Sequence, residues 1–397
     1  MLPNSTASKA AACARIFSKN CAPVPGLATK RSFSLGHETI ILAPGPCDRE
    51  DVVAGGKIIW VKAPVLVVDP RYHIFVRGAA VRRILDREQP DVVEGSSPWR
   101  GGWIVATWPG RAVKSLFMHS DPVASYPHTV LRPVLSRPRI DALFGWFWNY
   151  LCRLNAHFDT TVVSGEWLAA RFESFGLKKM QAVPLGVERR LFHGPLRHET
   201  VRREMLAACG LTHDAKILIC VGRHHPEKHI GTMIDAVNIA NRTSGQKVGL
   251  YIVGDGLSRK RVERKASTVP HVFVAGQITD RARVASLMAS ADALIHGCAS
   301  ETYGLAVAEA LCAATPVSVP DAGGAFDLAG AAYAEVYQAG EPDSAAQAIA
   351  RLLARPWAEL SRAAAEAAAA KVGDAATHFD RLFAHYQTLV DARKAAP

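Results

Sequence analysis

Two glutamates, Glu301 and Glu309, lie on either side of a lone glycine, Gly304, in the segment ASETYGLAVAEALCAATPV (299–317). An apolar run with helical spacing begins at Gly304, so its amide and that of Leu305 would be among the first N–H groups of a helix, which lack intrahelical acceptors. Such amides bind phosphate, and glycine admits a ligand close to the backbone. Glu301 could then contact sugar hydroxyls and Glu309 a ribose diol. The alternative interpretation is that Glu301 caps the helix and Glu309 is a surface residue.

A second group of candidate residues lies in the segment CVGRHHPEKHIGTMIDAV (220–237), where a buried strand is predicted to end at Gly222. Two cations, Arg223 and Lys228, follow that glycine before the next helix begins. They suit a diphosphate, because arginine binds an oxyanion through two parallel hydrogen bonds and lysine adds a point charge. The alternative interpretation is a solvated loop.

A third segment, YIVGDGLSRKRVERKA (251–266), places Gly254 and Gly256 on either side of Asp255 at the end of another predicted strand. The two glycines allow a tight backbone turn. The Gly-x-Gly-x-x-Gly fingerprint of a dinucleotide site needs a third glycine, and position 259 is arginine, so the segment argues against a Rossmann NAD site. By itself the GDG segment is also compatible with a simple turn.

Strands and helices that alternate along the chain must position these segments. With 397 residues, the chain is too long for one ordinary core and indicates two domains. Apolar runs predict strands at 38–43, 57–61, 90–95, 112–120, 159–165 and 180–186, and again at 216–222, 249–256, 271–276, 292–297 and 315–320. Amphipathic runs predict helices between them, among them 75–89, 146–158 and 165–176.

This alternation predicts two doubly wound α/β domains that face each other across a cleft. Ligands in such sheets bind beyond the carboxyl ends of the strands. All three polar segments are therefore expected at the cleft.

Taken together, the order and spacing of the motifs resemble those of the retaining GT-B glycosyltransferases of family 4. The matching segments within residues 215–330 are GRHHPEKHI, VGDG, SADALIHG, ETYGLAVAEAL and TPVSVPDAGGAFDL. The first half is similar through LGHETIILAPG (35–45) and PLGVERRLF (184–192). The resemblance implies a GT-B fold with two Rossmann-like domains, and a nucleotide-diphosphate sugar as the donor.

The resemblance also assigns roles to single residues. It implies that Arg223 and Lys228 neutralise the donor's diphosphate, that Glu309 binds the ribose and that Glu301 contacts the transferred sugar. His119, at the end of a predicted strand, matches a histidine that the family often has near the donor sugar. The alternative for His119 is a hydrogen-bonded scaffold residue.

The predicted site has three parts. The catalytic residues are His119, Arg223, Lys228 and Glu301; the donor-binding residues are Gly222, Gly254, Asp255, Gly256, Gly304, Leu305 and Glu309; the acceptor side has Trp99, a candidate sugar platform, and Asp121.

No Asp-x-Asp pair occurs in the chain, so we expect neither a metal held by paired aspartates nor a cofactor. Arg223, Lys228 and a helix start could stabilise the departing diphosphate instead, as the resemblance implies for metal-independent GT-B enzymes. We expect transfer with retention, in which a donor phosphate oxygen takes the acceptor's proton.

The N-terminus departs from the family, which opens with an apolar strand and a Gly-Gly loop. Residues 14–33 offer a single glycine, Gly26, and no convincing strand. The predicted organisation is a poorly ordered or atypical segment (1–35), an acceptor-side Rossmann-like domain (36–186), a nucleotide-sugar-binding Rossmann-like domain (187–375) and a C-terminal helix (376–397).

The net charge of +11 indicates an acidic partner, although solubility alone is the other interpretation. The aromatic run FGWFWNYLCRL (144–154) could rest on an anionic membrane surface, where lipid-linked acceptors reside, or could be a helix core. The sequence has no interleaved basic and aromatic residues of the kind that bind nucleic acid, so we expect no nucleic-acid partner. We therefore expect a lipid-linked or glycan acceptor and a cytoplasmic protein, in peripheral contact with the inner face of the membrane if the acceptor is a lipid.

Two other functions fit the same donor site. A nucleotide-sugar epimerase or hydrolase could share the fold, and a catalytically degenerate homologue could bind nucleotide without turnover. The base, the sugar, the acceptor and the oligomeric state are left open by the sequence.

Overall fold

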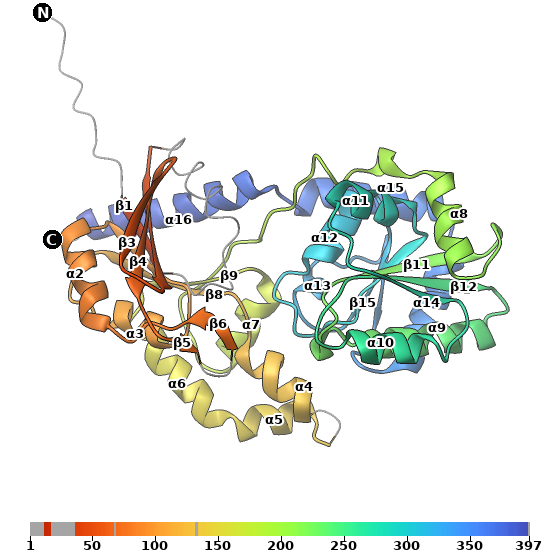
Figure 1. The fold of residues 1–397 in the computed structure, drawn as a ribbon, viewed down its shortest axis with the longest axis horizontal. Coiled ribbons are helices and arrows are strands. Elements are labelled where there is room, and N and C mark those ends of the chain that lie inside the picture. The colour runs from red at the N-terminus through yellow and green to blue at the C-terminus, as the bar shows by residue number, and fades with distance from the viewer. Residues whose placement is uncertain (1–11, 17–35, 67–68, 132–133, 396–397) are drawn as a thin grey trace, which may run out of the picture.

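Two separate β-sheets organise the chain in a computed structural model, which describes residues 12–16, 36–66, 69–131 and 134–395 (Figure 1). The first sheet has the order β10 (Met180–Ala182), β9 (Thr160–Val163), β8 (Val113–Met118), β7 (Val92–Gly95), β1 (Ala12–Ile16), β2 (Glu38–Gly45), β4 (Gly56–Lys62) and β3 (Arg49–Val53). All neighbours in it are parallel except β3 and β4. A short pair, β5 (Val65–Leu66) and β6 (Asp69–His73), stands apart from it.

The prediction that residues 14–33 contain no convincing strand is wrong at the start of that range, because Ala12–Ile16 are a strand. These residues form β1, which pairs with β2 on one side and β7 on the other. Sheet pairing on both sides stabilises a short segment whose own sequence carries little strand signal. Residues 1–11 and 17–35, where the rest of the predicted atypical segment falls, lie outside the described residues.

The second sheet has the order β13 (Val272–Gly276), β12 (Val248–Val253), β11 (Lys216–Val221), β14 (Ala293–Ile295), β15 (Val317–Pro320) and β16 (Ala334–Tyr337). All its pairs are parallel. The chain runs outward from β11 to β13 and then returns to β14 beside β11. The order therefore reverses between β11 and β14, which is where doubly wound sheets bind ligands.

Helices cover both sheets. In the first half they are α2 (Gly78–Glu88), α3 (Arg100–Ala106), η1 (Ala124–His128), α4 (Thr129–Leu131), α5 (Arg137–Leu143), α6 (Gly145–Asn155) and α7 (Glu166–Ser174). In the second half they are η2 (Gly194–Leu196), α8 (Glu199–Ala208), η3 (Pro226–Lys228), α9 (Ile230–Thr243), α10 (Arg259–Ala266), α11 (Arg281–Ser290), α12 (Leu305–Cys312), α13 (Gly324–Asp327), α14 (Pro342–Leu353), α15 (Trp357–Lys371) and α16 (Ala375–Ala395). None of the described helices is long and apolar enough to cross a bilayer.

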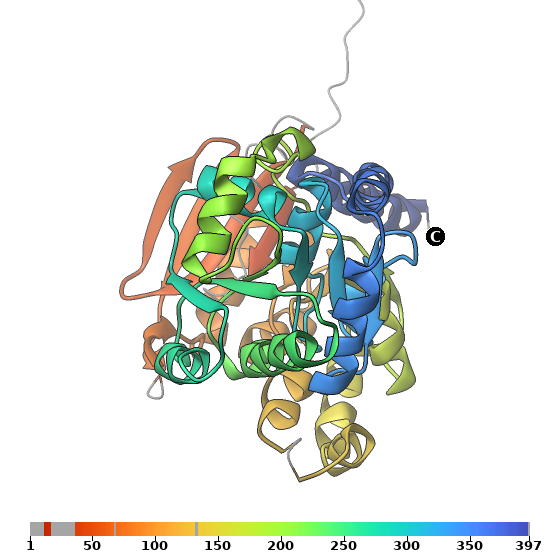
Figure 2. The same cartoon turned by 90° about the vertical axis from the view of Figure 1, so that its right-hand side faces the viewer.

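Alternate residues of β11 face opposite layers of helices, as the period of a strand requires. Ile217 and Ile219 pack in one core cluster with α8, α11 and α12, whereas Leu218 and Cys220 pack in another with α9, α10 and α14. Figure 2 shows helices on both sides of this sheet. The predicted doubly wound α/β architecture with two Rossmann-like domains is confirmed.

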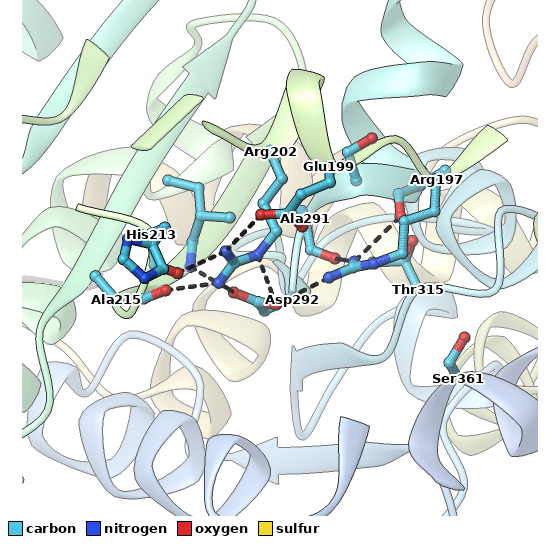
Figure 3. Close-up of polar contacts among 12 residues, drawn as sticks. Arg197, Glu199, Arg202, His213, Ala215, Ala291, Asp292, Thr315 and Ser361 are labelled. Atoms are coloured by element: carbon cyan, nitrogen blue, oxygen red, sulfur yellow. Dashed lines mark hydrogen bonds and ion pairs between the residues drawn. The ribbon is translucent and has the colours of Figure 1, made fainter. Parts of the chain in front are cut away.

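A buried ion pair fastens α8 to the second sheet (Figure 3). Arg202 of α8 donates from Nη2 to Asp292 Oδ2 at 3.0 Å, and its guanidinium also reaches the carbonyl oxygens of His213 and Ala215. The Asp292 carboxylate accepts a bond from the backbone N–H of Ile217 at 2.8 Å. Both charges are buried, and every nitrogen of the guanidinium and both carboxylate oxygens are hydrogen-bonded, which is the condition for a buried pair to be tolerated.

The last helix, α16, returns to the first domain and lies along its sheet (Figure 1). Tyr386 of α16 donates its hydroxyl to Glu94 Oε2 at 2.6 Å and lies 2.9 Å from Ser115 Oγ. Where the chain crosses between the domains, Gly186 lies against Asp374, so closely that a Cβ on Gly186 would fall 2.1 Å from the Asp374 carbonyl carbon. The predicted boundaries at 186/187 and 375/376 fall at these two crossings and stay predictions.

Candidate active site

An ion pair between two loops lies at the point where the strand order of the second sheet reverses. Lys228 ends η3, after β11, and Glu301 stands in the loop after β14; Lys228 Nζ donates to Glu301 Oε2 at 2.5 Å. His296 Nε2 lies 3.5 Å from the same oxygen. The two predicted catalytic residues therefore meet, although they are 73 positions apart in the sequence.

Both partners of this pair are charged. Burial alone would raise the pKa of Glu301, but Lys228 and His296 hold that pKa well below its ordinary value. Burial would likewise lower the pKa of Lys228, and Glu301 raises it above its ordinary value instead. The site thus keeps a fixed ammonium beside a fixed carboxylate, as an anionic ligand with hydroxyl groups requires.

Arg223 stands at the mouth of the same loop with its side chain 80% exposed. Its Nη2 lies 3.6 Å from Glu227 Oε1, and the charge of Glu227 also acts on Lys228. The two cations predicted to bind the diphosphate, Arg223 and Lys228, therefore both interact with the carboxylate of Glu227. Glu227 was not predicted, because its role depends on the fold of η3 rather than on spacing.

The glycines of the GDG segment permit two strand-end loops to touch. A Cβ on Gly254 (φ +144°) would lie 1.8 Å from the carbonyl oxygen of Gly222, and a Cβ on Gly256 would lie 2.7 Å from that of His224. The Asp255 carboxylate accepts bonds from the Gly256 N–H at 2.7 Å and from Arg259 Nη1 at 3.1 Å. Gly254, Asp255 and Gly256 are therefore explained by packing, because their contacts shape the loop that carries Arg223 and Lys228. Their predicted contact with the donor stays a prediction.

We expect Gly254→Ala to lower the free energy of unfolding by roughly 1–3 kcal/mol, because a methyl group there meets backbone at a positive φ. Chemical denaturation measures the change. Gly245→Ala is the matched control: Gly245 also has a positive φ, +68°, but a Cβ there would meet open space. Equal destabilisation by both substitutions would contradict the packing argument.

The start of α12 is built around Gly304, which adopts φ +90° and lies so near α13 that a Cβ would be 3.0 Å from Ala325 Cα. Leu305 is the first residue of the helix and is partly exposed. Gly324 donates its N–H to the Glu301 carbonyl at 2.6 Å and holds the preceding loop in place. The amides at this helix start thus lie directly after the Glu301 loop, where the sequence predicted them.

Glu309, inside α12, is buried and pairs with Arg281 at the start of α11. Arg281 Nη2 donates to Glu309 Oε1 at 2.6 Å. Burial raises the pKa of Glu309 above its ordinary value, while Arg281 opposes the shift. The guanidinium also stacks 5.0 Å from the ring centroid of Phe192. Arg281 was missed by the sequence analysis, since nothing in the local motif indicates this pairing.

The predicted residues of the first domain have different surroundings. His119 follows β8 and stacks on Phe117, with ring centroids 4.2 Å apart. Asp121 is fully buried: Oδ1 accepts bonds from the N–H groups of Val123 and Ala124 at 2.8 and 2.9 Å, and Oδ2 pairs with Arg171. With both oxygens engaged, Asp121 holds the turn that leads into η1 and ties it to Arg171; its predicted place on the acceptor side stays a prediction.

Trp99 is 53% exposed and belongs to an aromatic group. Its ring centroid lies 5.6 Å from that of Phe147 and 6.5 Å from that of Tyr150. These three rings line an open cavity of about 420 Å³. The predicted role of Trp99 as a sugar platform on the acceptor side stays a prediction.

One group of side chains within the described residues has the spacing of metal ligands. One atom each from His296, Cys298 and Glu301 lies within 4.8 Å of the others. The Glu301 oxygen near His296 is already bonded to the Lys228 ammonium, which supplies a positive charge at the place a metal ion would take. These residues therefore fit a metal poorly, and the expected absence of a metal stays a prediction.

Comparison with known protein families identifies the family to which the chain belongs. The family described as "Glycosyl transferases group 1" matches residues 201–371, and "Glycosyltransferase Family 4" matches residues 31–191. The chain is a GT-B glycosyltransferase of the family 4 type. Of the residues predicted to be catalytic, Arg223, Lys228 and Glu301 fall within the first match and His119 within the second.

Individual relatives agree with this assignment. The chain is 28% identical over 344 residues to a GDP-mannose-dependent alpha-(1-6)-phosphatidylinositol dimannoside mannosyltransferase of Mycobacterium tuberculosis, covering 83% of this chain and 82% of the relative. It is 28% identical over 301 residues to a GDP-mannose-dependent alpha-mannosyltransferase of the same species, covering 74% and 73%. The solved structure of sucrose-phosphate synthase from Thermosynechococcus elongatus superposes with a TM-score of 0.73 at 18% identity, covering 96% of this chain and 100% of that one, which shows the shared fold.

Proposed function

We propose that this glycosyltransferase is a retaining, metal-independent mannosyltransferase that takes mannose from GDP-mannose and transfers it to a lipid-linked acceptor. The observation that carries the proposal is the Lys228–Glu301 pair at the reversal point of the second sheet, with Arg223 exposed beside it. Two cations there suit a diphosphate and the carboxylate suits the hydroxyls of a hexose. The mannosyltransferase names of the relatives support the sugar and the base.

In the proposed complex, Arg223 and Lys228 bind the diphosphate together with the amides of Gly304 and Leu305. Glu301 accepts hydrogen bonds from the sugar hydroxyls, and His119 approaches the sugar from the first domain. This arrangement places positive charge where negative charge develops as the diphosphate departs, which is the largest electrostatic contribution such a site can make.

The proposed reaction takes place on one face of the sugar. The C1–O bond to the β-phosphate breaks, the acceptor hydroxyl oxygen bonds to C1 from the same side, and the hydroxyl proton moves to the departing phosphate oxygen. The products are the retained glycoside and GDP. Lys228 stays protonated throughout, as its raised pKa requires.

Nucleotide release in the presence of GDP-mannose, UDP-glucose and ADP-glucose tests the choice of donor. We expect release with GDP-mannose and a lipid-linked mannoside, and a mannosylated product with retained configuration. Release with UDP-glucose alone would overturn the proposed base, and an inverted product would overturn the proposed stereochemistry.

Replacing Glu309 by glutamine is expected to weaken GDP binding about tenfold or more, because a hydrogen bond to a charged group contributes roughly 1.5–3 kcal/mol. The pKa of Glu309 is raised, so wild-type affinity should fall with decreasing pH earlier than an ordinary glutamate would allow. Calorimetric titration with GDP measures both effects. Glu335→Gln, on the edge strand β16, is the control; unchanged affinity in Glu309→Gln would exclude the ribose contact.

The two other functions are less well supported. The relatives reported above are mannosyltransferases, and none favours an epimerase or hydrolase. The interpretation as a catalytically degenerate homologue depended on the absence of a first strand. Because β1 is present in the sheet, that argument no longer holds. Product analysis with and without acceptor separates the remaining cases: donor cleavage that ignores the acceptor would indicate a hydrolase.

The proposed acceptor places the protein at an anionic membrane surface, in agreement with its net charge of +11. Flotation with vesicles that contain or lack anionic lipid tests this contact. We expect flotation only with the anionic vesicles, and weaker flotation as salt rises, because screening shortens the reach of surface charge.

A further inference from the structure

An apolar cavity of about 420 Å³ opens on the first domain, between η1 and the start of α6, and α6 lies at the lower edge of that domain in Figure 1. Its wall is formed by rings and aliphatic groups, among them Trp99, Val123, Tyr126, Phe144, Trp146 and Tyr150. The proposed donor site has no part in it.

The hydroxyl of Tyr150 in the wall is already hydrogen-bonded to the protein. Tyr150 donates its hydroxyl to the Pro98 carbonyl at 2.6 Å, and Trp103 Nε1 donates to that hydroxyl at 3.0 Å. The ring faces of Trp99, Phe147 and Tyr150 are what remain to meet an occupant. A sugar would find few hydrogen-bond partners on a wall of rings and aliphatic groups, whereas an alkyl chain needs none.

The surface around the cavity is also apolar. The aromatic patch, defined as Tyr126, Val130, Val134, Leu143 and Trp146, has every side chain between 59% and 75% exposed. Contiguous exposed apolar groups of this kind mark contact with a membrane or partner.

The charges near the aromatic patch favour an anionic lipid surface. In the described part of residues 122–150, Asp141 is the single acidic residue, and it is bound by Arg171 at 2.9 Å and His128 at 2.9 Å. The cations Arg137 and Arg139 begin α5 beside the patch. Positive charge next to exposed aromatic rings is the composition of an interfacial segment.

The cavity also lies close to the interdomain cleft. Val123 and Tyr126 line it, while Ala124 and Thr129 of the same turn line a small gap shared with His229 and Ser300 of the second domain. His229 follows Lys228 in the chain, and Ser300 precedes Glu301. One turn of the first domain therefore borders both the cavity and the gap beside the loops of Lys228 and Glu301.

We propose that this cavity binds one alkyl chain of the lipid-linked acceptor, and that the aromatic patch rests on the membrane from which the chain is drawn. The inference rests on the proposed function and assigns its acceptor subsite. Each methylene that enters the cavity should raise affinity about fourfold, until the cavity is filled.

Titration with n-hexyl and n-octyl α-D-mannopyranoside, both as monomers, tests the cavity without requiring turnover. Two further methylenes should make the octyl compound bind about 16-fold more tightly to the wild type. The double variant Tyr126→Ser/Trp146→Ser removes two exposed lining rings and should lose most of this difference. Val52→Ser, at an exposed apolar site on β3 of the same domain that does not line the cavity, should retain it.

Equal affinity for the two mannosides in the wild type, or an unchanged ratio in the double variant, would overturn the inference. So would a dimer that the double variant dissociates, because a second copy would then cover the patch. GDP release with methyl α-D-mannopyranoside separates this inference from the proposed function: the double variant should match the wild type there. If the wild type released no GDP with methyl α-D-mannopyranoside, the proposed function would be refuted. The titration with the two alkyl mannosides would still test the cavity.

Discussion

Replacing Lys228 by alanine is expected to lower kcat about 100- to 1,000-fold, the loss typical of removing one donor that stabilises developing negative charge. Lys228 is the less exposed of the two cations in the donor loop, with its side chain 17% exposed against 80% for Arg223, and Glu301 holds it at 2.5 Å. Steady-state GDP release measures the effect. Activity within a few-fold of the wild type would remove Lys228 from the proposed mechanism.

Lys247→Ala is the matched control, because Lys247 is exposed and precedes β12, at the end of the sheet opposite the site. It should leave kcat unchanged. The double variant Lys228→Ala/Glu301→Gln separates charge from folding. It should recover the stability that Lys228→Ala alone loses, because the unpaired carboxylate is gone, but it should recover no activity.

The pH dependence of stability follows from the same pair. The pKa of Glu301 is lowered in the folded protein, so its contribution is present above the ordinary glutamate pKa and is lost as pH falls towards the folded value. Without Lys228, burial raises the pKa of Glu301, and the charged carboxylate destabilises the fold at neutral pH. The difference in unfolding free energy between wild type and Lys228→Ala should therefore be largest near pH 7 and shrink in acid.

Asp292→Asn is expected to cost about 3–5 kcal/mol of folding free energy, since it leaves the buried Arg202 guanidinium without its counter-charge. The substitution keeps the shape of the side chain, so the loss reports on charge and not on a cavity. Denaturant unfolding followed by circular dichroism measures it.

Glu199, a second acidic residue that lies near Arg202, provides the control. Glu199 Oε1 lies 3.7 Å from Arg202 Nη1, but its side chain is 53% exposed, and Figure 3 shows it near the buried pair. Glu199→Ala should cost less than about 1 kcal/mol, as exposed pairs do. A similar loss for both acids would mean that burial does not set the strength of this network.

The layout of the second domain could be predicted because its strands are apolar and its motifs stand directly after them. Gly222, Gly254 and Gly304 mark the ends of β11 and β12 and the start of α12, so chain order alone places their loops at one sheet edge. The contact between Lys228 and Glu301 follows from that placement.

Other features depend on contacts that no local pattern encodes. β1 is a strand because β2 and β7 flank it, and β3 pairs antiparallel with β4 through a polar sequence. The partner of Glu309 is Arg281, at the start of α11 rather than in any recognised motif. These pairings are decided by tertiary structure, which overrides local propensity.

The two places where the chain passes between domains are tied to each other. Val187 N–H donates to the Gly373 carbonyl at 3.0 Å, Arg189 Nη1 donates to the Val372 carbonyl at 3.1 Å, and His378 Nδ1 lies 2.9 Å from the Pro184 carbonyl oxygen. The two crossings are therefore bonded to each other as well as to their own domains. Pulling the domains apart would have to break these bonds or extend both segments at once.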